Sequence, residues 1–363
     1  MGWQVEKIKS LAKDKRINLN TIASKLEVSR QAVHAWINGQ IPKGQHLMRL
    51  STLLGVTPTF FFSNDINLAI SVPLHRKKGV SKITETNKLE AQQLAKEYEV
   101  LFKMTEPGVV PVLRIDDIGK KNAASWAQKL REIAGIKNGQ PIDYERAFTL
   151  LYRLGIVIVF RDFPASIKSY AFYCKIHNHR VAFVNTAINV LDLIFPLLHE
   201  TVHALLDERK TTLFEDEEET FCDAVANHMQ FPPEYIKTVT TAIEGCSKAI
   251  QVNKVKQFSS ENNHAMYGLV KLLPALDYKQ GFAGGDTNLR KEYHIIGEIL
   301  FKKQDPVDYI DSLKAFTPHF VEVVAKQIGN ASERKIGEWL NLGNKIDARL
   351  AVEALKRQGE SCA

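Results

Sequence analysis

Two histidines and a glutamate near the middle of the chain form its clearest chemical pattern. His199, Glu200 and His203 lie in the segment "PLLHETVHALLDERK" (residues 196–210). Histidines four residues apart share one face of a helix, so both imidazoles can reach one metal ion. Glu200 can face a water held by that metal; zinc lowers the pKa of such a water to about 7, and the glutamate can take its proton. The pattern predicts a zinc-activated hydrolase, and the alternative is an ordinary helix carrying these residues by chance.

A second segment downstream offers the third ligand that catalytic zinc commonly takes from protein. In "EDEEETFCDAVANHM" (215–229), Glu219 and Asp223 are four residues apart on a helix that turns apolar afterwards. This spacing lets Glu219 bind the metal while Asp223 accepts the N–H of a ligating histidine. We expect the rest of the acidic run, residues 215–218, to form a solvated helix N-terminus that complements the helix dipole.

Other histidines and cysteines give weaker patterns. His177 and His179 are expected to flank a hairpin turn near Cys174. Exposed turn histidines are the preferred interpretation there, although a second metal site is conceivable. His228 could stabilise an oxyanion, but a surface or core role is favoured over that function. Cys222 is interpreted as a small packing residue.

The segments around these residues predict the elements that must position them. Residues 123–136 have the pattern of an amphipathic helix, and residues 141–164 that of a helix followed by the β-branched strand "IVIVF". Residues 169–185 read as two strands around a His-Asn-His-Arg turn. From about residue 240 the chain is predicted to be helical, with a loop at the Gly-rich "GFAGGD" (281–286). The expected fold class is α+β, mostly α.

The first sixty residues predict a run of short helices. Asn18 can cap a helix through Leu26, and Glu27 with Val28 turns the chain. Ser29 can cap a second helix through about Asn38, and "GQHLMRLSTLLGV" begins another. The basic residues gather here: residues 1–62 hold nine Lys/Arg and three Asp/Glu, a net +6 of the chain's +7. A basic module at one end favours a polyanionic partner, most often nucleic acid.

Composition narrows the class of protein further. The chain has 363 residues, 45% hydrophobic and 25% charged, which predicts two or three globular domains. It contains no uncharged apolar run of the roughly 18–20 residues that span a bilayer. The N-terminus becomes charged at once, unlike a secretory signal, and four scattered cysteines give no disulfide framework. We therefore expect a cytoplasmic protein without membrane contact.

Residues 122–235 resemble the ImmA/IrrE family of metallopeptidases, relatives of the thermolysin-like enzymes. The resemblance runs through "AQKLREIAGIKNGQPIDYERAFTLLYRLGIVIVF", "VAFVN", "LLHETVHALL" and "EEETFCDAVANHMQFP". It implies a central thermolysin-like domain with a small β-sheet and Zn²⁺ as cofactor. The implied ligands are His199, His203 and Glu219, with Glu200 as general base and Asp223 beside a ligand. The chain departs from the family at "IFPL" before the histidines, at Val225-Ala226, and at "QFP". These changes affect packing and substrate fit but remove no reacting group.

Residues 16–62 resemble the Xre/lambda-repressor class of helix-turn-helix domain through "VSRQAVHAWINGQIPKGQHLMRLSTLLGV". Such domains place the start of the recognition helix against base edges in the major groove of operator DNA. Val33 and Trp36 fall on the inner face and are assigned to the core. Two departures, Leu19 for the usual Gln and Glu27 for the usual Gly, imply a lost phosphate or base contact. The residues that the resemblance places at DNA are Ser29, Arg30, Gln31 and His34 at the bases and Lys43 at a phosphate.

Together these patterns predict a helix-turn-helix domain (1–62), a linker with a long helix (63–110), a zinc metallopeptidase domain (111–238) and a helical C-terminal region (239–363). The resemblance implies a DNA-binding regulator with a zinc endopeptidase that cleaves a repressor, an antitoxin or its own linker. The alternative is an antitoxin-like repressor that binds its own operator and sequesters a partner toxin, the peptidase fold being an inactive scaffold. A non-peptidase metal hydrolase is the third hypothesis. Homodimerisation is expected if the operator is a palindrome.

Overall fold

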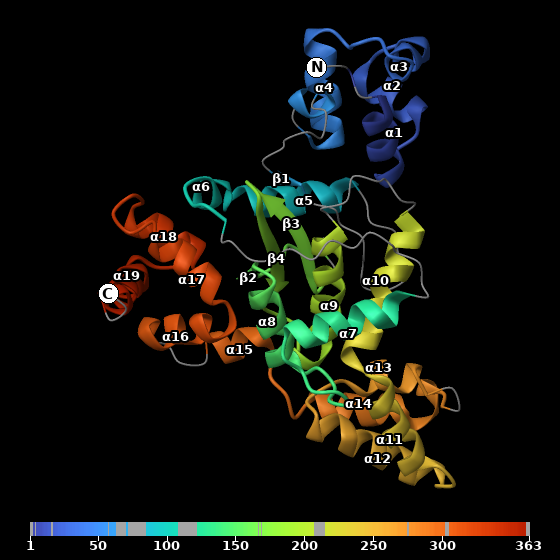
Figure 1. Cartoon of the computed structure of the whole chain (residues 1–363). Coiled ribbons are helices and arrows are strands. Elements are labelled where there is room, and N and C mark those ends of the chain that lie inside the picture. Colours follow the sequence, from blue (N-terminus) through green and yellow to red (C-terminus); the bar gives the residue numbers. More distant parts are fainter. Residues whose placement is uncertain are drawn as a thin grey trace. The chain divides into compact units, whose positions relative to one another are not determined.

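The computed structural model of the chain divides into two compact units, whose elements are labelled in Figure 1. The first comprises Met1–Glu99 with Pro164–Lys168, and the second comprises Val100–Phe163 with Ser169–Ala363. The residues that the structure describes are 3, 5–15, 17–56, 58–62, 70–71, 85–107, 122–165, 167, 169–206, 215–273, 276–301 and 305–360. Of the predicted linker with its helix, 63–110, the structure describes residues 70–71 and 85–107, and the latter contain two helices, Glu85–Lys96 and Glu99–Lys103.

Short helices build the first unit, as the sequence predicts. Asn18 accepts the backbone N–H of Thr21, and Ser29 that of Ala32, at the two predicted helix starts. Trp36 is buried in the core that these helices enclose. The elements are α1 (Val5–Asp14), α2 (Leu19–Leu26), α3 (Arg30–Ile37), α4 (Gly44–Leu54), the 3₁₀ turn η1 (Pro58–Phe61), the two-residue strand β1 (Ile70–Ser71) and α5 (Glu85–Lys96).

The turn between α2 and α3 is made by a residue with a left-handed backbone. Glu27 ends α2 with φ 58°, where its N–H bonds back to the carbonyls of Ala23 and Ser24. A left-handed conformation costs an L-residue roughly 1–2 kcal/mol, which explains why glycine is usual here. The exposed carboxylate of Glu27 forms an ion pair of 3.1 Å with Arg49 of α4, which also donates to the carbonyl of Leu26. The predicted turn is confirmed.

A small sheet with helices packed against it begins the second unit. Its strands β2 (Ile156–Arg161), β3 (Ala171–Ile176) and β4 (His179–Asn185) lie in the order β3-β4-β2. β4 pairs antiparallel with β3 and parallel with β2. Most strand side chains are buried, because helices pack against the sheet. The helices of this part are α6 (Glu99–Lys103), α7 (Ala123–Ile133), α8 (Tyr144–Arg153), α9 (Val190–Leu206) and α10 (Glu215–Gln230).

The hairpin between β3 and β4 differs from its predicted form at one histidine. Residues 177 and 178 make the turn, both with positive φ (45° and 69°), which suits the right-handed twist of a hairpin. His179 therefore belongs to β4 and is buried, so the prediction of an exposed turn histidine is wrong for it. Its ring lies 4.9 Å from that of Phe102, and its Nε2 lies 3.0 Å from the carbonyl oxygen of Thr105. This side chain fixes the end of α6 to the sheet.

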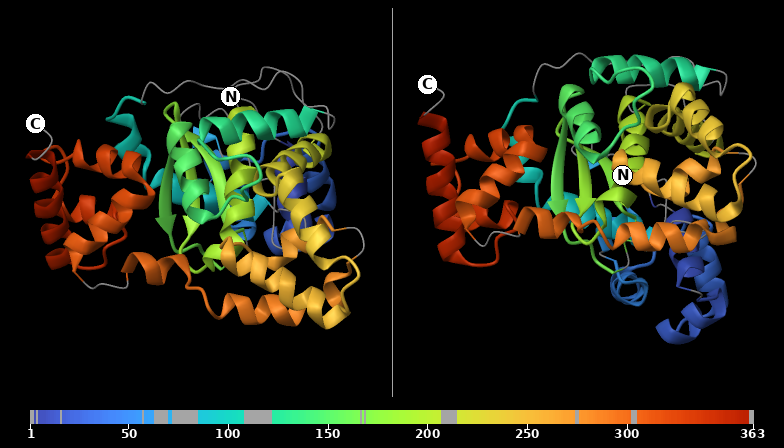
Figure 2. Two further views of the ribbon diagram at one scale, coloured as in Figure 1. Left: turned by 60° about the horizontal axis from the view of Figure 1, so that its bottom comes forward. Right: turned by 90° about the horizontal axis from the view of Figure 1, so that it is seen from below.

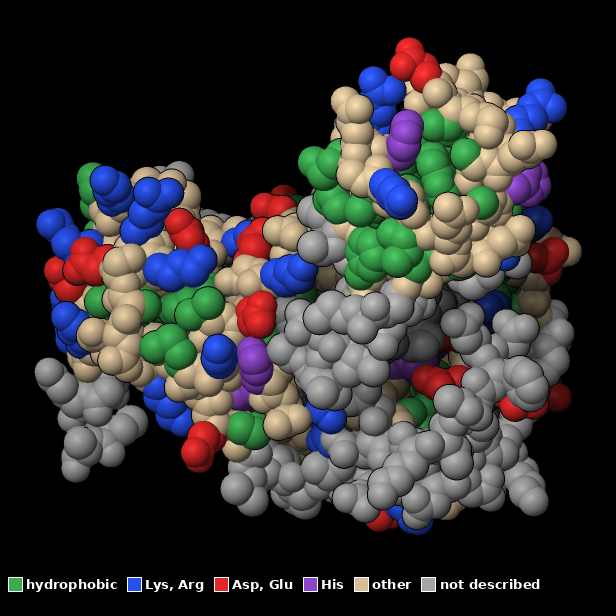
Figure 3. Space-filling view, turned by 90° about the horizontal axis from the view of Figure 1, so that it is seen from above, with side chains coloured by type: hydrophobic (Ala, Val, Ile, Leu, Met, Phe, Trp, Pro, Cys, Tyr) green, Lys and Arg blue, Asp and Glu red, His purple; other side chains and the backbone are tan. Residues whose placement is uncertain are grey.

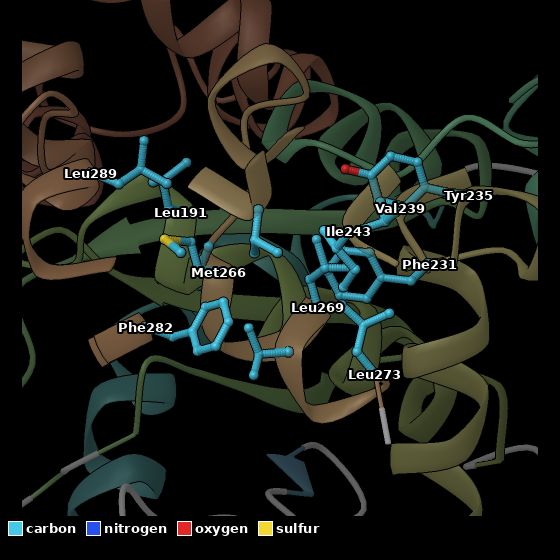
Figure 4. Packing of buried hydrophobic residues seen from close by; sticks show 13 residues of the cluster. Leu191, Phe231, Tyr235, Val239, Ile243, Met266, Leu269, Leu273, Phe282 and Leu289 are labelled. Atoms are coloured by element: carbon cyan, nitrogen blue, oxygen red, sulfur yellow. The ribbon is translucent and has the colours of Figure 1, made fainter. Parts of the chain in front are cut away.

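A separate hydrophobic cluster follows α10 (Figure 4). Its interior holds Phe231, Met266 and Phe282, together with Leu191 from the first turn of α9. The predicted loop at "GFAGGD" is wrong, because Gly281 (φ 92°) makes a kink and a helix begins directly after it. The elements are α11 (Pro233–Ile243), α12 (Lys248–Glu261), α13 (Met266–Lys271), η3 (Tyr278–Phe282) and α14 (Ala283–Arg290).

The remaining helices form a group on the other side of the sheet (Figure 2). The hydroxyl of Thr317 donates to the carbonyl of Ile158 and accepts its N–H, so it satisfies the outer edge of β2 as another strand would. Among the described residues from 240 onward, the prediction of mostly helical structure is confirmed. These elements are α15 (Ile296–Phe301), α16 (Pro306–Phe316), α17 (Pro318–Ala325), α18 (Glu333–Trp339) and α19 (Lys345–Glu360). Within the described residues, none of the helices is long and apolar enough to cross a membrane.

Candidate metal centre

Helix α9 carries the predicted histidines through the interior of the second unit. It packs against β3, α8 and α10, and its residues from Leu197 to Leu206 are buried throughout. The relative exposures of His199, Glu200 and His203 are 0%, 6% and 2%. Buried polar groups are costly unless they are paired, so these three residues need hydrogen-bond partners, opposite charges or a bound ion.

Helix α10 brings Glu219 to the two histidines. Nε2 of His203 lies 3.0 Å from Nε2 of His199 and 3.1 Å from Oε1 of Glu219. Oε2 of Glu219 lies 3.5 Å from Nε2 of His199. Among the described residues, these three side chains are the group whose ligand atoms all lie close enough to hold one metal ion. The structure thus brings together the three residues that the sequence predicts as ligands.

The outer nitrogens of both imidazoles face carboxylates of α10. Nδ1 of His199 lies 3.0 Å from Oδ1 of Asp223, as the spacing predicts. Nδ1 of His203 lies 2.9 Å from Oε1 of Glu218. The expectation that Glu218 belongs to a solvated helix end is therefore wrong, because its side chain is only 22% exposed and contacts a candidate ligand. Cys222 is buried as predicted, with its Sγ 3.6 Å from the same Nδ1.

This arrangement fits a tetrahedral metal ion such as zinc. A carboxylate at Nδ1 favours the tautomer with hydrogen on Nδ1, which leaves a lone pair on Nε2. Two such lone pairs facing each other at 3.0 Å repel unless a cation lies between them. Bonds of about 2.0–2.1 Å place tetrahedral ligand atoms about 3.3 Å apart. The observed separations of 3.0, 3.1 and 3.5 Å bracket that value.

The charges around the site also favour a cation. Burial alone lowers the pKa of His203, but its contacts with Cys222, Glu218 and Glu219 outweigh burial and raise the pKa well above its usual value. Burial raises the pKa of Glu219, but the two histidines outweigh it and lower that pKa. Burial raises the pKa of the Cys222 thiol to about 11, so this group stays neutral. A positive charge is thus stabilised at the Nε2 atoms, whether a proton or a metal supplies it.

Glu200 lies beside the ligands but is held by the sheet. Its Oε2 accepts the backbone N–H of Tyr173 in β3 at 2.9 Å. Burial raises the pKa of this carboxyl, so it can take up a proton more readily than an exposed glutamate does. The role of Tyr173 was not predicted, because a backbone donor leaves no signature in residue type.

The predicted DNA-binding residues gather on α3 of the first unit. Arg30, Gln31 and His34 are exposed on one face of this helix, while Val33 and Trp36 are buried on the other. The hydroxyl of Ser29 accepts the N–H of Ala32, so it serves first as a helix cap. Lys43 is exposed at the start of α4. On the face of the N-terminal domain seen at the upper right of Figure 3, Lys and Arg side chains lie apart from one another, and Asp or Glu side chains are also seen there.

Comparison with known families supports this part of the chain. Residues 8–61 match the family model described as helix-turn-helix. No curated protein matches the chain. The N-terminal domain is therefore a helix-turn-helix domain, the fold of a DNA-binding regulator.

Proposed function

We propose that the chain is a DNA-binding regulator whose second unit is a zinc-dependent endopeptidase of the ImmA/IrrE type. The observation that carries the enzymatic part is the convergence of His199, His203 and Glu219 beside the buried carboxylate of Glu200. The helix-turn-helix match supports the regulatory part. The peptide substrate we infer is a regulatory protein: a repressor, an antitoxin or the chain's own linker.

The residues of the site suit peptide-bond hydrolysis. His199, His203 and Glu219 would hold zinc, which when bound polarises the scissile carbonyl and makes a water acidic. Glu200 would accept the proton of the attacking water and deliver it to the leaving amine. Its hydrogen bond from Tyr173 fixes the orientation of the carboxylate, and burial raises its pKa toward the range in which both transfers are possible. Asp223 would keep the His199 ring in place.

The regulatory part rests on the exposed face of α3. Arg30 can donate to guanine edges or phosphates, Gln31 can pair with adenine, and His34 lies one helical turn further along. Lys43 would contact a phosphate. Because the peptidase is joined to this domain, it would be located at the operator. A repressor bound to that operator would then be cleaved where it acts.

The second candidate function is an antitoxin-like repressor that sequesters a partner while its peptidase fold stays inactive. The observation that supports it is the helix-turn-helix match over residues 8–61, the DNA-binding part that such a repressor needs. Both candidate functions include DNA binding, so they are distinguished by whether the metal centre cleaves peptide bonds. An inactive scaffold does not require a carboxylate at Glu200.

The first test is the metal content of the purified protein, measured by elemental analysis for wild type, His203→Ala and Glu219→Ala. We expect about one zinc per chain in wild type and loss of zinc in both variants. The second test compares protein N-termini in cells that express wild type or Glu200→Gln. New N-termini that depend on Glu200 identify the substrate. Zinc binding with identical N-termini in both strains would instead favour the scaffold function.

A further inference from the structure

The first five residues of α10 include three consecutive glutamates with different surroundings. Glu217 is exposed, Glu218 contacts His203, and Glu219 lies at the Nε2 atoms of both histidines. The side chain of Glu218 retains 22% of its exposure, and its Oε1 lies 2.9 Å from Nδ1 of His203. The acidic run is therefore more than a charge complement to the helix dipole.

We propose that Glu218 is a positioning residue of the metal centre, accepting the Nδ1–H of His203 so that Nε2 faces the ion. This inference rests on the proposed zinc site, and it assigns Glu218 the role at His203 that Asp223 has at His199. Helix α10 then supplies one ligand, Glu219, and one orienting carboxylate for each histidine ligand. The orientation of both rings depends on this single helix.

The competing partner of the same nitrogen is much weaker. Sγ of Cys222 lies 3.6 Å from Nδ1 of His203, whereas Oε1 of Glu218 lies 2.9 Å from the same atom. A hydrogen bond to a carboxylate is shorter and roughly twice as strong as one between neutral groups. Without the Glu218 side chain, the sulfur of Cys222 would be a poorer acceptor for Nδ1–H, and the His203 ring could adopt the other tautomer. Its Nε2 would then carry hydrogen and could not bind a metal ion.

The carboxylate also contributes charge. Glu200, Glu218, Glu219 and Asp223 surround two imidazoles that are neutral when they bind metal. Partial burial reduces the screening of these charges by water, so the negative charge of Glu218 favours a dication more than an exposed glutamate does. Glu217 carries the same formal charge one residue away, but its side chain is exposed.

These surroundings define a matched set of variants. Glu218→Gln removes the charge and preserves the shape, Glu217→Gln makes the same change at an exposed position, and Asp223→Asn is the comparator at the other ring. Zinc affinity is measured on the full chain by competition with a chromogenic chelator. Co²⁺ loading with visible absorption spectra then reports the ligand geometry independently of activity. Circular dichroism of the chelated proteins selects variants that fold.

We expect Glu218→Gln and Asp223→Asn to weaken zinc binding on the order of 10–100-fold and to alter the Co²⁺ spectrum. We expect Glu217→Gln to stay within about twofold of wild type, because exposed charges are screened. Glu218→Ala, which has no acceptor at all, should bind zinc more weakly than Glu218→Gln. Equal affinity in Glu218→Gln and Glu217→Gln, with one zinc in wild type, would overturn the inference and leave the proposed function standing. A wild type that takes up no zinc would overturn both.

Discussion

Acidification should loosen the helical cluster that supports the start of α9, and the group responsible is His264. Its ring is fully buried, and its Nε2 lies 2.7 Å from the hydroxyl oxygen of Tyr235. Its Nδ1 lies 3.1 Å from the carbonyl of Ala265, which makes Nδ1 the donor and Nε2 the acceptor of the tyrosine hydroxyl. Phe231 packs edge-on against the ring. This environment satisfies a neutral imidazole, whereas a charged one would be buried beside two neutral hydrogen-bonding groups, the Ala265 carbonyl and the Tyr235 hydroxyl.

The magnitude follows from the two pKa values. Burial lowers the pKa of folded His264 to about 4, from an ordinary 6.5, with Ala265 and Asp286 opposing it only in part. Below pH 6.5, His264 therefore binds a proton in the unfolded state, whereas in the folded state it stays neutral until the pH falls to about 4. The free energy of unfolding of this cluster is unaffected above about pH 6.5, and it decreases as the pH falls from 6.5 to about 4. The loss is about 2 kcal/mol between about pH 7 and about pH 4.5, and about 3 kcal/mol once both values are passed.

The assay is hydrogen exchange by mass spectrometry on peptides from α11 to α14, with wild type and His264→Gln compared at the same pH. Glutamine can still accept the Tyr235 hydroxyl but does not titrate. At about pH 7 the variant should exchange faster, because it packs less well. At about pH 4.5 the wild type should lose about 30-fold more protection than the variant does over the same interval. Parallel pH profiles in the two proteins would refute the reasoning, and chelated samples exclude pH-dependent loss of the metal as the cause.

Three further predictions concern the turn, the DNA-binding face and the metal. Glu27→Gly should stabilise the N-terminal domain by about 1 kcal/mol, because glycine adopts the left-handed backbone without the steric cost and the exposed ion pair with Arg49 contributes little. Faster hydrogen exchange in α2 and α3 of the variant would contradict this. Arg30→Ala should weaken binding to a duplex selected from a random pool about 10-fold or more, measured by fluorescence anisotropy, whereas Lys103→Ala should not. Chelation of zinc should lower the melting temperature of the second unit and leave exchange in α2–α4 unchanged, and a shift in both would argue against a local site.

Local interactions account for what the sequence predicted well. Asn18 and Ser29 each cap a helix by accepting the backbone N–H of the residue three positions further along the chain. Such a contact is local, so it can be predicted without knowledge of the rest of the fold. The pairing of His199 with His203 likewise follows from helical spacing. Glu219 and Asp223 share a helix face for the same reason, and the structure places one at the Nε2 atoms and the other at Nδ1 of His199.

Tertiary contacts account for the failures. His179 was expected in an exposed turn, but the turn is only two residues long, and the strand buries the histidine against Phe102 and Thr105, far away in sequence. The glycines of "GFAGGD" favour a loop locally, yet α14 forms there because its residues pack beside α12 and α13. Gly285 lies so close to Val252 and Met266 that an added Cβ would be 3.2–3.3 Å from them. A tight helix contact, which no local propensity encodes, selects glycine at this position.

The contact between Glu218 and His203 shows why the candidate metal centre can be predicted only in part from the sequence. Spacing within α10 determines that Glu219 and Asp223 share a face of that helix. The angle at which α10 meets α9 determines whether the adjacent Glu218 also reaches His203. Each residue turns a helix by about 100°, so one residue inserted between Glu218 and Glu219 would turn Glu218 away from His203. An insertion before residue 215 would leave the internal spacing of 218, 219 and 223 intact. The two insertions should therefore differ sharply in zinc binding, although they lengthen the chain equally.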